Sequence, residues 1–315
     1  MKVSQKDIFL GSDPEFFLTK QGEIYPAFNL LGSNENPTFT KDGQNSMYYD
    51  NILIEYTTTP SNSLKSWMHN QKSVLKEVQN KVIKLAGAKL VYSVSAEVPN
   101  DAMEDDRVHE FGCNPVLNVY DEENALKAVS NPFKLRFAGG HVHISYPREN
   151  IETTRDIIKK LDLHLGLPSL LIEPFNTRRG YYGKAGAFRR VPGSRFEYRT
   201  LSNFWLYHDN YLTWVYNTIL KVVLDTLNFK MEPIEESLTK KVSYAINTGN
   251  TELALHICNN NNIKILKNET NIRLWNINEG LRKSSLDGKF KISRKSTNSR
   301  QTSLKGWGNS ILEEN

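Results

Sequence analysis

Four separate segments of the chain alternate apolar and charged residues with a two-residue period, which is the pattern of β-strands with two unlike faces. These segments are residues 8–18 (IFLGSDPEFFL), 47–57 (MYYDNILIEYT), 137–145 (FAGGHVHIS) and 194–200 (SRFEYRT). One face of each carries aromatic or aliphatic side chains that suit packing against helices. The other face carries carboxylates, imidazoles or guanidinia, whereas an ordinary solvated strand favours a less specialised polar mixture.

The alternation assigns particular residues to these polar faces. They are Asp13 and Glu15 in the first segment, Asn51 and Glu55 in the second, His141 and His143 in the third, and Arg195, Glu197 and Arg199 in the fourth. Any one such strand by itself would be read as a solvent-facing strand. If all four belong to one sheet, an assumption that the sequence does not prove, their acids and bases gather on one surface.

Helical periodicity appears between and after these segments. Apolar residues recur at three, four or seven positions over 63–86 and 150–165, and a third pattern of this kind starts near Asp209. Because helices and strands are intermixed without a dividing linker, we expect an α+β domain over residues 1–230. Residues 231–315 are then a helical C-terminal extension.

Composition excludes several classes of protein. The chain has 315 residues, of which 39% are hydrophobic and 24% charged, so a disordered or fibrous protein is excluded. Cys113 and Cys258 are its two cysteines, which rules out a disulfide framework and a four-cysteine zinc site. The sequence shows neither a signal peptide nor a membrane-spanning stretch. We therefore expect a cytoplasmic protein that does not contact membranes.

The basic charge is concentrated near the C-terminus. The formal net charge is +5, yet residues 282–305 contain eight Lys or Arg and the single acid Asp287. That segment could contact nucleic acid or another polyanion, or it could be a solvated end of the chain.

The polar faces indicate a metal and a phosphate ligand. Two carboxylates about 4 Å apart repel by roughly 4 kcal/mol at an effective dielectric constant near 20. Glu15, Glu55 and Glu197 could therefore share a pocket only when protonated or bridged by cations. Oxygen ligands with one or two imidazoles suit Mg²⁺ or Mn²⁺, and arginines bind phosphate oxygens. Together these groups indicate a nucleotide triphosphate or another polyphosphate.

A glycine-bearing loop adds further basic residues at 178–190 (RRGYYGKAGAFRR). Its cations are Arg178, Arg179, Lys184, Arg189 and Arg190. The loop resembles a phosphate-handling loop, but it is not a Walker A motif, because Ala185 follows Lys184. An exposed basic loop without a ligand is the alternative interpretation.

The order DPE, strand glutamate, GGHVH and RFEYR resembles the glutamine synthetase and glutamate–cysteine ligase superfamily of carboxylate–amine ligases. It is most similar to the phage-encoded COOH–NH2 ligase family of type 2, over about residues 8–205. The resemblance implies a concave antiparallel sheet with helices packed on its convex face. It also implies ATP and Mg²⁺ (or Mn²⁺) as cofactors, and small-molecule or peptide carboxylate and amine substrates joined through an acyl phosphate. A homo-oligomer is left open.

The same resemblance implies a role for each site residue. The metal ligands would be Asp13, Glu15, Glu55, His141 and Glu197; the cofactor-binding residues His143, Arg179, Lys184 and Arg195; and the catalytic residues Arg199, Arg189 and Lys184. Arg199 would meet the transferred phosphate and His143 the nucleotide. In glutamine synthetases the second-strand region supplies a pair of more widely spaced glutamates, and here only Glu55 is clearly found, so the number of metals, two or three, stays open.

Two other functions compete with this one. The chain could bind nucleic acid through residues 282–305 without being an enzyme. The pair His141 and His143, with Glu149 further along, loosely resembles a cupin-type metal site and would suit a metal hydrolase or oxygenase. That second interpretation leaves the DPEF and RFEYR segments unexplained.

Overall fold

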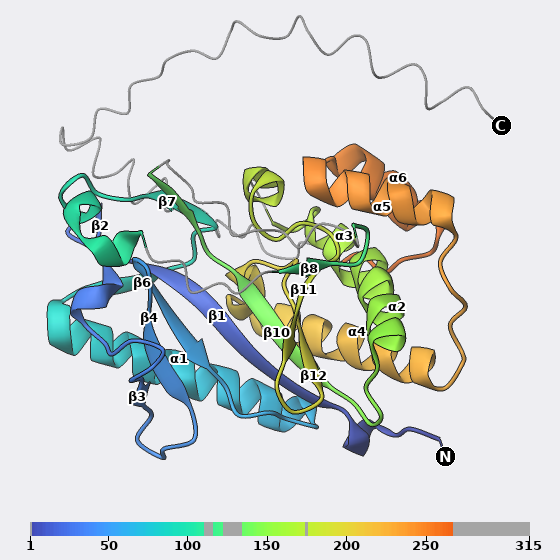
Figure 1. The fold of residues 1–315 in the computed structure, drawn as a ribbon, viewed down its shortest axis with the longest axis horizontal. Helices are drawn as coiled ribbons and strands as arrows, with labels where there is room; N and C mark the ends of the chain where they lie inside the picture. Colours follow the sequence, from blue (N-terminus) through green and yellow to red (C-terminus); the bar gives the residue numbers. More distant parts are fainter. Residues whose placement is uncertain (1, 110–115, 122–133, 174–175, 267–315) are drawn as a thin grey trace, which may run out of the picture. The chain divides into compact units, whose positions relative to one another are not determined.

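An antiparallel sheet forms the centre of the computed structural model, which describes residues 2–109, 116–121, 134–173 and 176–266 (Figure 1). Its strands run in the order β3-β4-β5-β1-β10-β12-β11-β8, β2 and β6 also pair with β1, and β7 and β9 form a separate pair. The strands are β1 (Phe9–Lys20), β2 (Glu23–Ile24), β3 (Thr38–Phe39), β4 (Ser46–Asp50), β5 (Leu53–Thr57), β6 (Lys89–Val91), β7 (Ser95–Glu97), β8 (Leu117–Asn118), β9 (Leu135–Phe137), β10 (Gly140–Ser145), β11 (Ala187–Val191) and β12 (Arg195–Tyr198).

The three predicted helices are present and begin at polar caps. The α-helices are α1 (Leu64–Ala86), α2 (Ile151–Leu161), α3 (Leu167–Ser169), α4 (Asp209–Leu227), α5 (Glu236–Thr248) and α6 (Thr251–Asn260). The Ser63 hydroxyl accepts a hydrogen bond from the Ser66 amide at the start of α1, and the Asn150 side chain accepts one from the Thr153 amide at the start of α2. A π-helical turn over Asp162–Gly166 continues α2 into α3.

The apolar strand faces pack under helices, as the alternation predicted. Phe16, Val142 and Phe196 are fully buried in one core together with residues of α1, α2 and α4. Within this core the ring of Trp67, from α1, stacks on the ring of Trp205 with centroids 5.4 Å apart. The predicted antiparallel sheet with helices against it is thereby confirmed (Figure 1).

The prediction that residues 47–57 form one strand is wrong. They form a hairpin in which β4 and β5 pair with each other and the chain reverses at Asn51 and Ile52. Asn51 has a φ of 57°, a left-handed conformation that asparagine tolerates better than most residues. Its side chain donates a hydrogen bond to the Val108 carbonyl and accepts one from Arg136, so Asn51 does not join the polar face with Glu55.

Helices α5 and α6 pack against the domain rather than standing apart from it. Their buried residues, including Val242 and Ile257, join one apolar cluster with Leu163 and Leu167. The domain boundary at residue 230 stays a prediction, and the basic segment 282–305 lies outside the described residues. No helix in the described part of the chain has the length and apolarity needed to cross a bilayer.

A buried carboxylate joins the helical layer to the sheet. Asp162 accepts hydrogen bonds from the hydroxyls of Tyr120 (2.9 Å), Tyr198 (2.7 Å) and Thr200 (3.0 Å) and from the Gly186 amide (2.6 Å). Asp162→Ala would leave these donors without that acceptor, and each unsatisfied buried donor costs about 1–3 kcal/mol. We expect Asp162→Ala to lower the free energy of unfolding by at least about 3 kcal/mol in urea denaturation.

The matched control is Glu236→Ala on α5, which removes an exposed ion pair with Lys240. This change should alter the free energy of unfolding by less than about 0.5 kcal/mol. Equal effects of the two substitutions would contradict the role assigned to Asp162.

Candidate active site

The four strands with ligand-bearing faces are direct neighbours, in the order β5-β1-β10-β12. Glu15 of β1 pairs with Glu55 of β5, and Asp13 of β1 pairs with His141 of β10. Two residues further along β10, His143 pairs with Glu197 of β12. Because directly paired residues project to the same face of a sheet, these registers bring the predicted side chains together. The assumption that the four strands share one sheet is confirmed.

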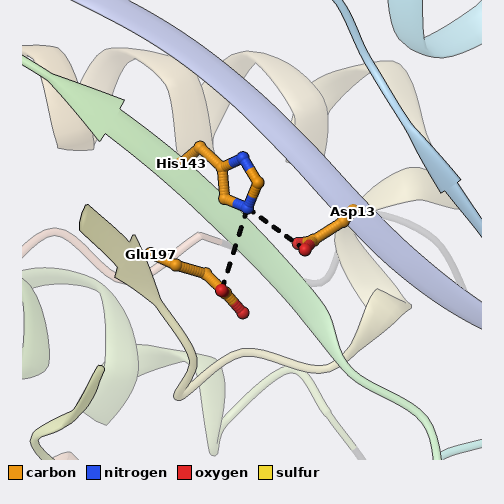
Figure 2. A group of neighbouring side chains, drawn as sticks. All are labelled: Asp13, His143 and Glu197. Carbon is orange, nitrogen blue, oxygen red and sulfur yellow. Dashed lines mark hydrogen bonds and ion pairs between the residues drawn. The ribbon is translucent and has the colours of Figure 1, made fainter. Parts of the chain in front are cut away.

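The first group of candidate metal ligands is Asp13, His143 and Glu197, whose ligand atoms all lie within 4.8 Å of one another. Figure 2 shows the His143 ring between the two carboxylates. His143 Nε2 is 3.1 Å from Asp13 Oδ2 and 3.8 Å from Glu197 Oε2. His141 faces the same carboxylates, with Nδ1 3.1 Å from Glu197 Oε1 and 3.7 Å from Asp13 Oδ1. The geometry thus places His143, which the resemblance made a nucleotide contact, among the candidate ligands.

The second group is Glu15, Asp50 and Glu55, again with ligand atoms within 4.8 Å of one another. The Tyr48 hydroxyl donates a 2.6 Å hydrogen bond to Glu55 Oε1. The sequence interpretation did not include Asp50 among the site residues. Asp50 is the last residue of β4, and it lies beside Glu55 because the hairpin turn after it pairs β4 with β5. An Asp-Asn pair between two alternating runs is a turn signal, and it could have indicated this arrangement.

The second group and Asp13 of the first group line one pocket, together with two arginines. The pocket residues are Asp13, Glu15, Asn34, Tyr48, Tyr49, Asp50, Glu55, His141, Arg189 and Arg199. Arg189 Nε donates a 2.6 Å hydrogen bond to Glu197 Oε2, and Arg199 pairs with Glu197 Oε1. Arg189 remains partly accessible, with 27% of its side chain exposed, whereas the Arg199 side chain is 4% exposed.

Burial and mutual repulsion shift the pKa values of the site. Burial, reinforced by Asp50, raises the pKa of Glu15 to about 8. Burial also raises the pKa of Glu55 well above its usual range, with further contributions from Asp13 and Asp50. The pKa of His141 is held well below its usual value by burial and by the Arg199 guanidinium. Burial opposes ionisation of His143 as well, but the Asp13 and Glu197 carboxylates together outweigh burial and raise the pKa of His143.

Tyr182, from the loop 178–190, is a further member of the site that the sequence interpretation missed. Its hydroxyl donates a 2.9 Å hydrogen bond to Glu15 Oε1 and accepts one of 2.9 Å from Arg199 Nη2. The same oxygen lies 3.1 Å from His141 Nε2. Its signal in the sequence is its place in the glycine-bearing loop, which drew attention for its cations instead.

The cations of that loop separate into different environments. Arg178 and Arg179 are fully buried and pair with Glu173, and both donate to the Thr200 carbonyl. The alternative of an exposed basic loop therefore does not hold for these two residues. Arg179 contacts protein groups in this structure, and Lys184 is half-buried and is not among the pocket residues. Their binding roles remain predictions.

The remaining sequence candidates are placed as follows. Arg195 begins β12, pairs with Ser145 and is half-buried on the same face as Glu197. Glu149 accepts a 3.0 Å hydrogen bond from Thr154 and lies 3.8 Å from Arg190. Glu149 is thus absent from both groups of candidate ligands found among the described residues. Glu149 therefore does not supply the carboxylate ligand that the cupin-type interpretation expected beside His141 and His143.

Comparison with solved structures gives remote similarities. The bifunctional glutathione synthetase from Pasteurella multocida is 8% identical over 90% of this chain and 50% of that one, with a TM-score of 0.43. The complex between the prokaryotic ubiquitin-like protein Pup and its ligase PafA is 9% identical over 89% of this chain and 63% of that one, with a TM-score of 0.42. The chain thus spans less than two thirds of either.

Comparison of sequences gives one family. No curated protein matches the chain significantly. Residues 115–275, just over half of the 315 residues, match the family described as phage phiEco32-like COOH.NH2 ligase-type 2. The matched range includes β10, β11 and β12 and therefore His141, His143 and Glu197. The chain belongs to this family of phage-type carboxylate–amine ligases.

Proposed function

We propose that the protein is an ATP- and Mg²⁺-dependent carboxylate–amine ligase that forms an amide bond through an acyl phosphate. The observation that carries the proposal is the set of five carboxylates and two imidazoles gathered beside two arginines, with four of the carboxylates, one imidazole and both arginines lining one pocket. Family membership supports the reaction class. The substrates are a carboxylic acid and an amine, and Mn²⁺ is an alternative cation.

The donor set fits a divalent metal. The positive charges at the site come from the guanidinia of Arg189 and Arg199, which are fewer than the carboxylates. The carboxylates are Asp13, Glu15, Asp50, Glu55 and Glu197. Asp13 Oδ1 is buried and has no hydrogen-bond partner. A buried, unpartnered carboxylate oxygen is costly unless a cation neutralises it. Carboxylate oxygens with imidazole nitrogens suit Mg²⁺ or Mn²⁺. We propose that the two groups of candidate ligands, together with His141, bind these cations.

The pocket suits activation of a carboxylate by phosphoryl transfer. A carboxylate is a poor electrophile, and its phosphorylation by ATP produces an acyl phosphate that an amine can attack. Mg²⁺ bound by the acidic residues would neutralise phosphate charge. Arg199 and Arg189 would bind phosphate oxygens and stabilise the charge on the group in transfer, while the buried walls exclude water. Tyr182 and Glu197 hold Arg199 in place.

Activity is tested by ADP release from ATP that depends on added amine, using pools of carboxylic acids and primary amines as substrates. Glu197→Gln removes the charge that binds both arginines and faces both histidines, so we expect at least a hundredfold loss of the amine-dependent rate. The control Glu236→Gln changes an exposed residue of α5 and should keep the full rate. Full activity in Glu197→Gln would refute the site assignment.

Binding is tested by thermal denaturation with a non-hydrolysable ATP analogue, with Mg²⁺ or with EDTA. We expect the analogue to raise the melting temperature only when Mg²⁺ is present, because the proposed site binds phosphate through the metal. Glu197→Gln should abolish the increase. A melting temperature of the wild type that changes with neither nucleotide nor metal would favour the nucleic-acid-binding alternative. That alternative relies on residues 282–305, which lie outside the described part of the chain.

The raised pKa of Glu15 predicts a pH dependence of stability. In the metal-free protein the neutral form of Glu15 is favoured by folding, so its contribution is complete below about pH 4.5 and is lost as pH rises through about 8. We expect the melting temperature without metal to fall between pH 5 and 8 and Mg²⁺ to raise it more at pH 8 than at pH 5. Glu15→Gln should flatten this profile, and Glu236→Gln should leave its slope unchanged.

A further inference from the structure

We propose that Tyr182 is a positioning residue that sets the tautomer of His141 and so presents Nδ1, not Nε2, to the metal. This inference rests on the metal-dependent function proposed above. It begins from the Tyr182 hydroxyl, which lies 2.9 Å from Glu15 Oε1, 2.9 Å from Arg199 Nη2 and 3.1 Å from His141 Nε2.

The hydrogen count of a phenol determines the direction of these bonds. A tyrosine hydroxyl has one hydrogen and two lone pairs. Arg199 can only donate, so it occupies one lone pair. Glu15 is ionised when it binds the metal proposed above; it can then only accept, so it takes the hydrogen. The remaining lone pair of Tyr182 then accepts from His141, which requires the hydrogen of the neutral imidazole to be on Nε2.

The opposite side of the His141 ring faces acidic oxygens. Nδ1 lies 3.1 Å from Glu197 Oε1, 3.7 Å from Asp13 Oδ1 and 3.9 Å from Glu15 Oε1. In the tautomer with hydrogen on Nε2, the Nδ1 lone pair points toward these acceptors, and ionised carboxylates offer no hydrogen to it. A divalent cation held among them would satisfy the lone pair and the oxygens together. A metal-ligating histidine commonly donates its other N–H to a neighbouring oxygen, which is the place of the Tyr182 hydroxyl here.

The substitution Tyr182→Phe isolates the hydroxyl from the ring. The ring stacks on Phe137 with centroids 6.5 Å apart and lies under the guanidinia of Arg178 and Arg199, and phenylalanine can keep all of these contacts. Tyr181 provides the matched control. Its ring also stacks on Phe137, with centroids 5.7 Å apart, but its side chain is exposed to solvent. Tyr181→Phe therefore removes a hydroxyl from the same loop outside the site.

The experiment titrates Mn²⁺ into each protein and measures free Mn²⁺ by electron paramagnetic resonance. We expect Tyr182→Phe to weaken Mn²⁺ binding by about 10- to 100-fold. Tyr181→Phe should bind within about twofold of the wild type, as expected for a residue outside the ligand shell. Equal affinity of Tyr182→Phe and wild type overturns the inference and leaves the proposed function intact. Absence of Mn²⁺ binding by the wild type overturns both.

Two further measurements identify the nitrogen. In the Mg²⁺-loaded wild type, ¹⁵N-histidine NMR should show hydrogen on Nε2 of His141, and hydrogen on Nδ1 would overturn the inference. Independently of Tyr182, the amide of His141→Asn reaches the position of Nδ1, whereas that of His141→Gln reaches the position of Nε2. His141→Asn should bind Mn²⁺ more tightly than His141→Gln, and the reverse order would count against Nδ1 as the ligand atom.

Discussion

Repulsion among buried carboxylates is the constraint on which the rest of this structure depends. Asp13, Glu15, Glu55 and Glu197 are each at most 8% exposed, and such a group of like charges opposes folding unless protons, cations or donors compensate it. The chain itself supplies part of the compensation through the guanidinia and tyrosine hydroxyls around the pocket. The raised pKa values of Glu15 and Glu55 indicate that the chain leaves the rest of the compensation to protons or to a metal. Buried, mutually repelling groups of this kind mark functional sites.

The fold holds the cluster by attaching it to a rigid sheet. Each ligand-bearing strand buries its opposite face in the core shared with α1, α2 and α4, so the polar side chains cannot separate without breaking that core. Backbone contacts tighten the arrangement further. The Gly139 amide donates a 2.5 Å hydrogen bond to Glu15 Oε2, and a Cβ at Gly139 would lie 2.2 Å from His141 Nε2. Only glycine permits this approach of the backbone to the imidazole.

Behind the site, a second charged group supports the loop that carries Tyr182. Glu173 pairs with the fully buried Arg178 and Arg179, and Arg178 donates to the Tyr182 carbonyl at 3.1 Å. Arginine suits this task because its guanidinium keeps its charge and can bind several acceptors in fixed directions. The cations of the basic loop therefore have different roles. Arg178 and Arg179 hold the loop in place through its backbone carbonyls, whereas Arg189 lines the pocket. A count of basic residues in the sequence cannot make this distinction.

The sequence by itself determined the faces of three strands, since side-chain alternation is a local property that survives wherever the backbone stays extended. It also indicated a metal and phosphate chemistry through the residue types on those faces. Tertiary structure decided what local periodicity cannot encode: the reversal at Asn51 that brings Asp50 beside Glu15 and Glu55, the burial of Arg179, and the approach of Tyr182 to His141. These features depend on which strands pair and in which register, and that choice is made by packing between residues far apart in the chain.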